Sequence, residues 1–143
     1  MAPPPTVKGI PLAPGERVVY YRHDDGRTAR IVFAILGVVF LVAVLGVIFL
    51  IAALFDYRTT IVITTQRFIL VKGKDPPKWI PHGQVRRLVR VIKGGLRSID
   101  LYDANGSELS FHVRSDAALA ETITRYVENP ALAAQAPSVP YEA

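Results

Sequence analysis

The feature that most constrains this chain is an uninterrupted apolar run from Ile31 to Phe55. Its 25 residues include no charged residue and no proline. As one α-helix the run would extend for roughly 37 Å, enough to cross a hydrocarbon core of about 30 Å. A buried helix of a water-soluble protein is normally shorter and amphipathic, so that alternative is disfavoured. The run therefore predicts a single transmembrane helix over residues 31–55.

The basic residues on the two flanks leave the orientation open. Lysine and arginine near a membrane segment mark its cytoplasmic side, but residues 16–30 and 56–74 carry four each. Two topologies fit this tie: a single span, or a shallow hairpin with bends at Gly37 and Gly46 that returns both flanks to the cytoplasm. A run of this length is too short for two full crossings, which favours the single span. We expect a single-pass membrane protein with residues 56–143 in the cytoplasm.

The rest of the chain has room for one small domain between two tails. Residues 1–30 read as a proline-rich extended tail with a short strand at 16–23, and residues 130–143 as a disordered tail. Residues 56–129 alternate between apolar and polar positions, and the segment 84–92 also fits helical spacing, although its flanking glycines favour a strand. The predicted strands are 57–64, 67–72, 78–80, 84–92, 96–103 and 107–113.

The clearest local signal is a β-hairpin around Ala104-Asn105-Gly106, because Asn-Gly favours a tight two-strand turn. In its second strand Leu109, Phe111 and Val113 should face the core. Ser115 can cap a final helix that carries one apolar stripe. The predicted fold class is α+β: a single transmembrane helix, then an antiparallel sheet or partly open barrel capped by a C-terminal helix.

Four stretches resemble the bacterial pleckstrin-homology-like (PH-like) domain, a family often found next to membrane segments. They are PLAPGERVVYY before the apolar run, then VITTQRFILVKG, WIPHGQVRRLVRV and IDLYDANGSELSFHV, followed by the terminal helix. The resemblance covers about 70 residues plus the leader. It implies a non-catalytic binding or scaffolding module, and its motifs are patterns of strand and turn.

Charge is distributed unevenly along the chain. Residues 58–97 carry ten basic residues against Asp75 alone, a net charge of +9, whereas residues 98–143 have a net charge of −5. A basic region beside a membrane is attracted to anionic headgroups by about 1 kcal/mol per nearby Lys or Arg. The alternative is that these charges are the solvated faces and protected edges of strands.

We expect one face of the strand at 84–92 to contact anionic lipid. Strict alternation would place Arg86 and Arg90 on one side and turn the row of Arg87, which is more apolar, toward the core. The predicted lipid-binding residues are Arg86, Arg90, Lys93, Arg97, Lys78 and Trp79. Trp79 could insert at the headgroup level, or it could lie in the core or cover a loop.

Catalysis, metals and cofactors find no support in the residues. The three histidines are scattered, there is no cysteine, and no phosphate-binding glycine loop or nucleophile motif is present. Nucleic acid is disfavoured, because only Phe68 and Trp79 could stack bases within the basic region. The predicted function is a membrane-anchored PH-like module that binds anionic lipid. The alternative is a structural accessory subunit that binds a membrane protein, or a second copy of itself, through its sheet or apolar helix.

Overall fold

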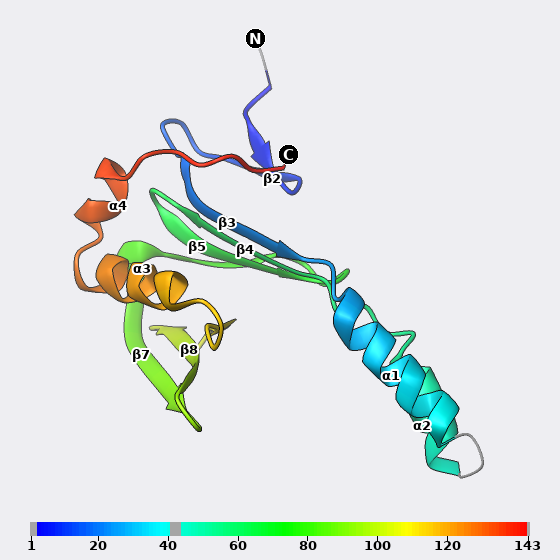
Figure 1. Ribbon diagram of the computed structural model, residues 1–143. Helices are drawn as coiled ribbons and strands as arrows, with labels where there is room; N and C mark the ends of the chain where they lie inside the picture. Colours follow the sequence, from blue (N-terminus) through cyan, green and yellow to red (C-terminus); the bar gives the residue numbers. More distant parts are fainter. Residues whose placement is uncertain (1–2, 41–43, 143) are drawn as a thin grey trace. The chain divides into compact units, whose positions relative to one another are not determined.

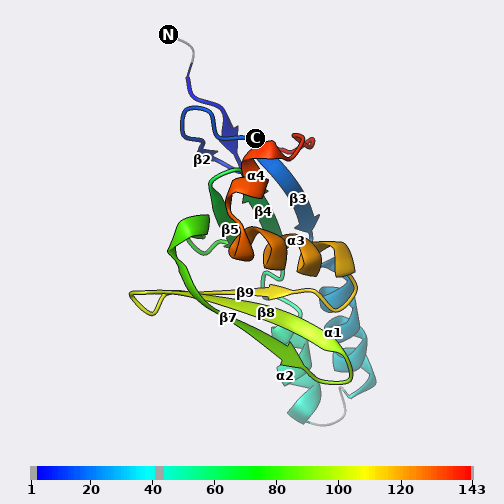
Figure 2. The same ribbon diagram turned by 90° about the vertical axis from the view of Figure 1, so that its left-hand side faces the viewer.

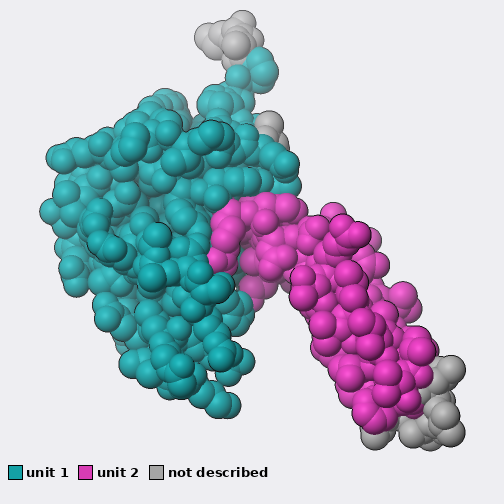
Figure 3. All heavy atoms as spheres, viewed as in Figure 1, with its two compact units in different colours: residues 1–21, 61–70, 77–143 teal, residues 22–60, 71–76 magenta. Residues whose placement is uncertain are grey.

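The computed structural model describes residues 3–40 and 44–142, which form two compact units. Unit 1 comprises Met1–Tyr21, Ile61–Leu70 and Pro77–Ala143, and unit 2 comprises Arg22–Thr60 and Val71–Pro76 (Figure 3). Unit 2 contains the whole apolar run.

The strands form three sheets (Figures 1 and 2). In the described residues they are β1 (Thr6–Val7), β2 (Ile10–Pro11), β3 (Val18–Asp24), β4 (Thr59–Thr64), β5 (Arg67–Lys72), β6 (Lys78–Pro81), β7 (Val85–Ile92), β8 (Leu96–Asp103) and β9 (Glu108–His112). Their orders are β1-β2, β3-β4-β5-β6 and β7-β8-β9. The helices are α1 (Arg27–Val39), α2 (Val44–Ala52), α3 (Ala117–Glu128) and α4 (Ala131–Gln135), with a 3₁₀ turn at His82–Gln84.

One apolar core joins the two larger sheets and α3. It is built from alternate strand residues and from the apolar stripe of α3, because alternate positions of a strand share a face. Its largest members are Ile61, Ile63, Phe68, Ile80, Ile99, Leu101, Leu109, Phe111, Leu119 and Ile123. The burial predicted for Leu109, Phe111 and Val113 is confirmed, and β8 and β9 pair antiparallel on either side of Asn105.

A buried histidine completes this core. His82 is 4% exposed, and its ring packs edge-on against that of Phe68 with the ring centroids 4.4 Å apart. Its Nε2 lies 2.7 Å from the Thr64 carbonyl oxygen. A carbonyl oxygen only accepts, so Nε2 must carry the proton. Burial lowers the pKa of His82, although the Thr64 carbonyl and the Glu16 carboxylate oppose this. The imidazole is therefore a neutral packing group.

The N-terminal segment packs on the sheet instead of extending as a tail. Val7, Ile10 and Leu12 are buried. Glu16, whose side chain is fully buried, accepts hydrogen bonds from Arg67 Nε at 2.9 Å and from the Thr64 hydroxyl at 2.6 Å. The segment is thus bonded to the end of β4 and the start of β5, and the side chains on both faces of these strands are largely buried.

The C-terminal segment also differs from the predicted tail. Residues Ala131–Gln135 form α4, and Ala133 is fully buried. Beyond α4, Val139 N donates to the Val18 carbonyl at 3.0 Å, and Lys8 pairs with Glu142 at 2.8 Å. The expectation of a disordered segment at 130–143 is therefore wrong for the described residues. The prolines of this segment interrupt the apolar period that would have predicted structure. Its backbone and side chains nevertheless bond to β3 and to the N-terminal segment.

The single transmembrane helix predicted over residues 31–55 is wrong. The described part of this run forms two shorter helices, α1 of 13 residues and α2 of 9 residues, and neither is long and apolar enough to cross a membrane. They pack against each other at Gly37, where an added Cβ would lie 2.5 Å from the Leu50 side chain. Phe33 and Phe49 stack with ring centroids 6.4 Å apart. A count of apolar residues could not separate one long helix from two packed ones.

Helix α3 is capped one residue later than predicted. Asp116, and not Ser115, is its N-cap, because Asp116 Oδ1 accepts the Leu119 backbone N–H at 2.9 Å. Serine and aspartate are both favoured N-cap residues, so the sequence alone did not distinguish position 115 from position 116.

Truncation of Phe111 tests the position of the core. Phe111 is fully buried, whereas Phe55 is 62% exposed. We expect Phe111→Ala to lower the free energy of unfolding of unit 1 by about 3–5 kcal/mol, because it leaves a cavity. The matched control Phe55→Ala should change that transition by less than about 0.5 kcal/mol. The measurement is denaturant unfolding of the full chain in mild detergent, and equal effects would contradict the assigned core.

Neutralising Glu16 tests the attachment of the leader. Glu16→Gln leaves the Arg67 charge largely buried without its partner, which should cost about 3–5 kcal/mol of stability near neutral pH. Glu121→Gln is the control, because its pair with Arg125 is exposed and should contribute less than about 1 kcal/mol.

The same pair predicts an acid dependence. Burial alone would raise the pKa of Glu16, but hydrogen bonds from Arg67, Thr64 and the Ala13 N–H together lower it below its ordinary value. A carboxyl whose pKa is lowered in the folded state stabilises the fold above its unfolded pKa, and this contribution is lost as pH falls through the folded pKa. The stability difference between the parent and Glu16→Gln should therefore shrink as pH falls below about 4.5. A difference that stays constant in acid would contradict the role of the ion pair.

Candidate functional site

The largest apolar surface lies on the helical pair of unit 2. Apart from Trp79, Ile92 and Tyr141, the exposed large apolar side chains of the described residues all lie in this pair and the turn after it. They are Ile31, Val32, Ile35, Val38, Val39, Phe40, Val47, Ile48, Ile51, Leu54 and Phe55. Exposed patches of this kind mark interaction surfaces, because isolated soluble proteins rarely leave so much contiguous apolar area in water.

Gly26 fixes how this helical pair begins. Gly26 has φ +68°, and an added Cβ would lie 2.5 Å from Tyr57 Cβ and 2.6 Å from its backbone carbon. Only glycine meets both demands. This contact brings the start of α1 against the segment that follows α2. The Tyr57 hydroxyl donates to the Ala52 carbonyl at 2.6 Å, which ties the end of α2 to the same place.

A pocket of about 590 Å³ opens at this base. It is lined by three arginines, one aspartate and three apolar residues. The lining residues are Asp25, Arg27, Arg30, Ile31, Ala34, Ala53 and Arg58. Binding pockets for small molecules typically range from about 300 to 1,000 Å³, so the size is adequate for a ligand.

The three arginines of this pocket differ in their partners. Arg58 is held by Asp56, with Nε 2.9 Å from Oδ1 and Nη2 2.6 Å from Oδ2. Hydrogen bonds from Arg58 lower the pKa of Asp56 to about 2. Arg30 Nε makes a long bond of 3.4 Å to the Ala53 carbonyl. The Arg27 guanidinium forms no ion pair or hydrogen bond with the residues that the structure describes, although the Arg27 backbone N–H donates to Asp25 Oδ1 at 3.0 Å.

The sequence analysis used Arg27 and Arg30 only as topology markers and did not predict this pocket. The spacing of Arg27, Arg30, Ile31 and Ala34 places all four on one face of a helix, which was a usable signal. The sequence could not show that Ala53 and Arg58 line the same pocket, because this depends on the chain reversing between α1 and α2.

A β-bulge decides how β7 presents its basic residues. Val85 pairs with Asp103 and Arg87 pairs with Tyr102, so Arg86 is the extra residue of the bulge. Strict alternation is thereby broken, and both Val85 and Leu88 pack against the core.

The prediction that the row of Arg87 faces the core fails beyond the bulge: Val85 of that row packs against the core, but after Arg86 it is Leu88 of the other row that does so. Arg87 is exposed, and its guanidinium carbon lies 4.8 Å from the ring centroid of Tyr102. Arg90, predicted to share a solvent face with Arg86, reaches α3 instead, where Nη2 donates to the Thr124 hydroxyl at 3.3 Å. Arg90 also lines a shallow cavity with two acidic residues of α3, Glu121 and Glu128.

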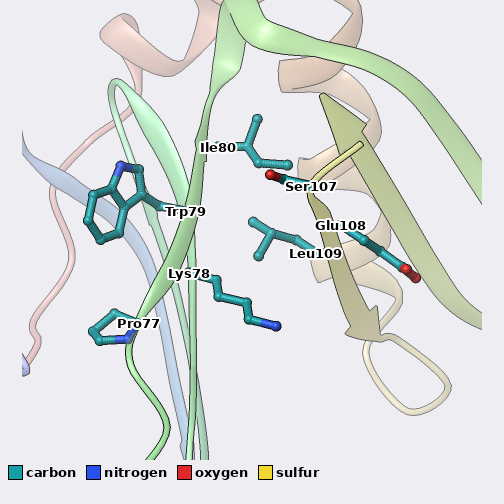
Figure 4. A pocket seen from close by; sticks show the side chains of 7 residues that line it. All are labelled: Pro77, Lys78, Trp79, Ile80, Ser107, Glu108 and Leu109. Carbon is teal, nitrogen blue, oxygen red and sulfur yellow. The ribbon is translucent and has the colours of Figure 1, made fainter. Parts of the chain in front are cut away.

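The other predicted lipid-binding residues do not gather on one face. Lys93 lies in the β7–β8 turn, and Arg97 is exposed near the start of β8. In β6, Lys78 points toward β9 and Trp79 points away from it (Figure 4). Trp79 is 49% exposed and carries the Arg67 guanidinium 5.2 Å from its ring centroid, so it is not a core residue.

A pocket of about 380 Å³ lies between β6 and β9 (Figure 4). Lys78 and Glu108 give its walls opposite charges, and Ile80 and Leu109 form its floor. No buried polar atom points to a ligand there. Nor do the residues described by the structure bring together three acidic, histidine or cysteine side chains that could hold a metal ion.

Comparisons of this chain with protein-family models, with curated proteins and with solved structures give no match. The resemblance of its strand and turn motifs to the bacterial PH-like domain therefore stays a prediction.

Proposed function

We propose that this protein is a non-catalytic binding module that works at an anionic membrane surface, with the α1–α2 pair inserted into one leaflet. The observation that carries the proposal is the exposed apolar surface of the pair, which is bounded at one end by arginines. In water this surface is costly to leave exposed, at about 25 cal/mol per Å². Lipid acyl chains would remove that cost.

The length of the pair supports entry into one leaflet. α1 has 13 residues and rises about 20 Å, which is less than a hydrocarbon core of about 30 Å. Because the pair reverses direction, its first and last residues lie at the same end. Both flanks would then remain on one side of the membrane, which accounts for the equal numbers of basic residues on them.

Electrostatics supports the choice of an anionic surface. Unit 2 contains six basic residues, Arg22, Arg27, Arg30, Arg58, Lys72 and Lys74, and four acidic ones, Asp24, Asp25, Asp56 and Asp75. Each basic group near an anionic surface contributes about 1 kcal/mol. The small net positive charge would add to the apolar contribution without replacing it.

The PH-like domain belongs to the proposal as its binding module. After the helical pair come the strands β4 to β9 and then the helix α3, and antiparallel strands closed by a C-terminal helix are what the resemblance implies. Functionally, the module would hold its ligand or partner close to the lipid surface.

A second candidate is a structural accessory subunit whose apolar helices pack against another membrane protein. The close approach at Gly37 favours it in one respect, since small residues let helices pack tightly in lipid. However, Gly37 is already occupied by Leu50 of the same chain, so its surface is not available to a partner.

Flotation of the full chain on lipid vesicles tests the proposed function. We expect the parent to float with phosphatidylcholine vesicles and more strongly when they contain phosphatidylglycerol, and salt should weaken only the added part. Val38→Glu places a charge on the exposed apolar face and should reduce flotation at least tenfold, because a carboxylate in hydrocarbon costs about 2.5 kcal/mol or more.

Ala118→Glu is the matched control for this experiment. Ala118 is exposed on α3 in unit 1, so the same charge change should leave flotation unaltered. If the parent fails to float on either vesicle, or if Val38→Glu floats as the parent does, the accessory-subunit hypothesis replaces the lipid one.

Thiol labelling in cells tests the topology. The chain contains no cysteine, so single cysteines can be introduced at Pro4 and at Ser115, both of which are exposed. We expect an impermeant reagent to label the two positions equally before and after permeabilisation, because a hairpin keeps both on one side. Opposite accessibility of the two positions would contradict the hairpin.

A further inference from the structure

The pocket at the base of the α1–α2 pair is lined by both basic and apolar residues. Arg27 and Arg30 are among the basic ones, and Ile31, Ala34 and Ala53 make up its apolar wall. We propose that this pocket binds the phosphate of one anionic phospholipid, with the glycerol and first part of an acyl chain against the apolar wall. The proposal rests on the membrane-surface function proposed above and names the ligand of that site.

The guanidinium groups suit a phosphate. Arginine presents a planar fork of donors that matches the oxygens of phosphate, and charge-assisted bonds of this kind are the stronger ones. The Arg27 guanidinium has no partner among the described residues and the Arg30 guanidinium only a long bond, so both are available. Arg58 is held in one position by its hydrogen bonds to Asp56.

The single carboxylate of the pocket does not block an anion. Asp25 Oδ1 already accepts the Arg27 backbone N–H, which holds this carboxylate at the turn before α1. Arg58 is paired with Asp56, which leaves the guanidinium groups of Arg27 and Arg30 against this one carboxylate. The balance of charge therefore favours an anionic ligand.

The apolar wall distinguishes a lipid from free phosphate. Ile31, Ile35 and Val38 follow one another along one face of α1, since they are spaced by four and three residues. All three are at least 48% exposed. An acyl chain that starts in the pocket can continue along this row, whereas inorganic phosphate could use only the arginines.

Native mass spectrometry of the full chain in detergent micelles tests this site. We expect one dioctanoyl-phosphatidylglycerol to bind at least tenfold more tightly than dioctanoyl-phosphatidylcholine, whose cationic headgroup opposes the arginines. Arg27→Gln with Arg30→Gln should weaken phosphatidylglycerol binding at least tenfold, because two charge-assisted contacts are removed. Both arginines are exposed, so their loss should not unfold the chain.

Lys72→Gln with Lys74→Gln is the matched control. It removes the same charge from unit 2 at residues that do not line the pocket, and it should change the affinity less than about twofold. Equal weakening by the two double variants would overturn the site, as would displacement of the lipid by inorganic phosphate at a similar concentration.

The site and the proposed function fail in distinguishable ways. The arginine variant keeps the apolar pair and should still float on phosphatidylcholine vesicles. A parent that floats on vesicles but binds phosphatidylglycerol no more tightly than phosphatidylcholine would refute the pocket alone. A parent that binds no vesicle but still captures the short-chain lipid in detergent would refute the membrane function and leave the pocket standing.

Discussion

Two strands separated by the whole apolar run, β3 and β4, are hydrogen-bonded neighbours in one sheet. Adjacent strands lie about 4.8 Å apart, so the chain that leaves β3 must return to almost the same place before β4 begins. A straight helix over residues 31–55 would separate its ends by roughly 37 Å and is incompatible with that pairing. The hydrogen-bond contact between His23 and the Thr60 hydroxyl, 2.7 Å long, joins the two flanks directly.

The reversal of the apolar run follows from this pairing and has chemical consequences. It places Arg30 and Ala53 within hydrogen-bonding distance, although they stand at opposite ends of the run. It also brings Arg27 and Arg58 to the walls of one pocket. The proposed lipid pocket could not exist on a single straight helix, because its lining comes from both ends of the run. The site is thus a product of strand pairing outside the helices.

The sequence predicted the local elements of the fold well, because their signals are local. The period-two pattern and the Asn105-Gly106 pair determine β8 and β9, and the apolar stripe determines α3. The reversal of the apolar run was not predictable in this way, because the pairing of β3 with β4 has no sequence pattern within either strand. The faces of β7 were predicted wrongly because one extra residue, Arg86, breaks the alternation, and a bulge has no reliable pattern of its own.

Contacts within the chain reduce the effect of the net charge of +9 in residues 58–97. Arg67 is committed to the buried Glu16, Arg58 to Asp56, and Arg90 bonds to α3 beside acidic residues. The charges of Arg67 and Arg58 are already balanced by carboxylates within the chain, so counting each of them as an attraction to lipid overstates the effect. Among the described residues, Arg86 and Arg97 in this segment and Arg27 and Arg30 before it are exposed and have no carboxylate partner. Electrostatic attraction to a membrane therefore depends less on the number of basic residues than on which of them lack a carboxylate of their own.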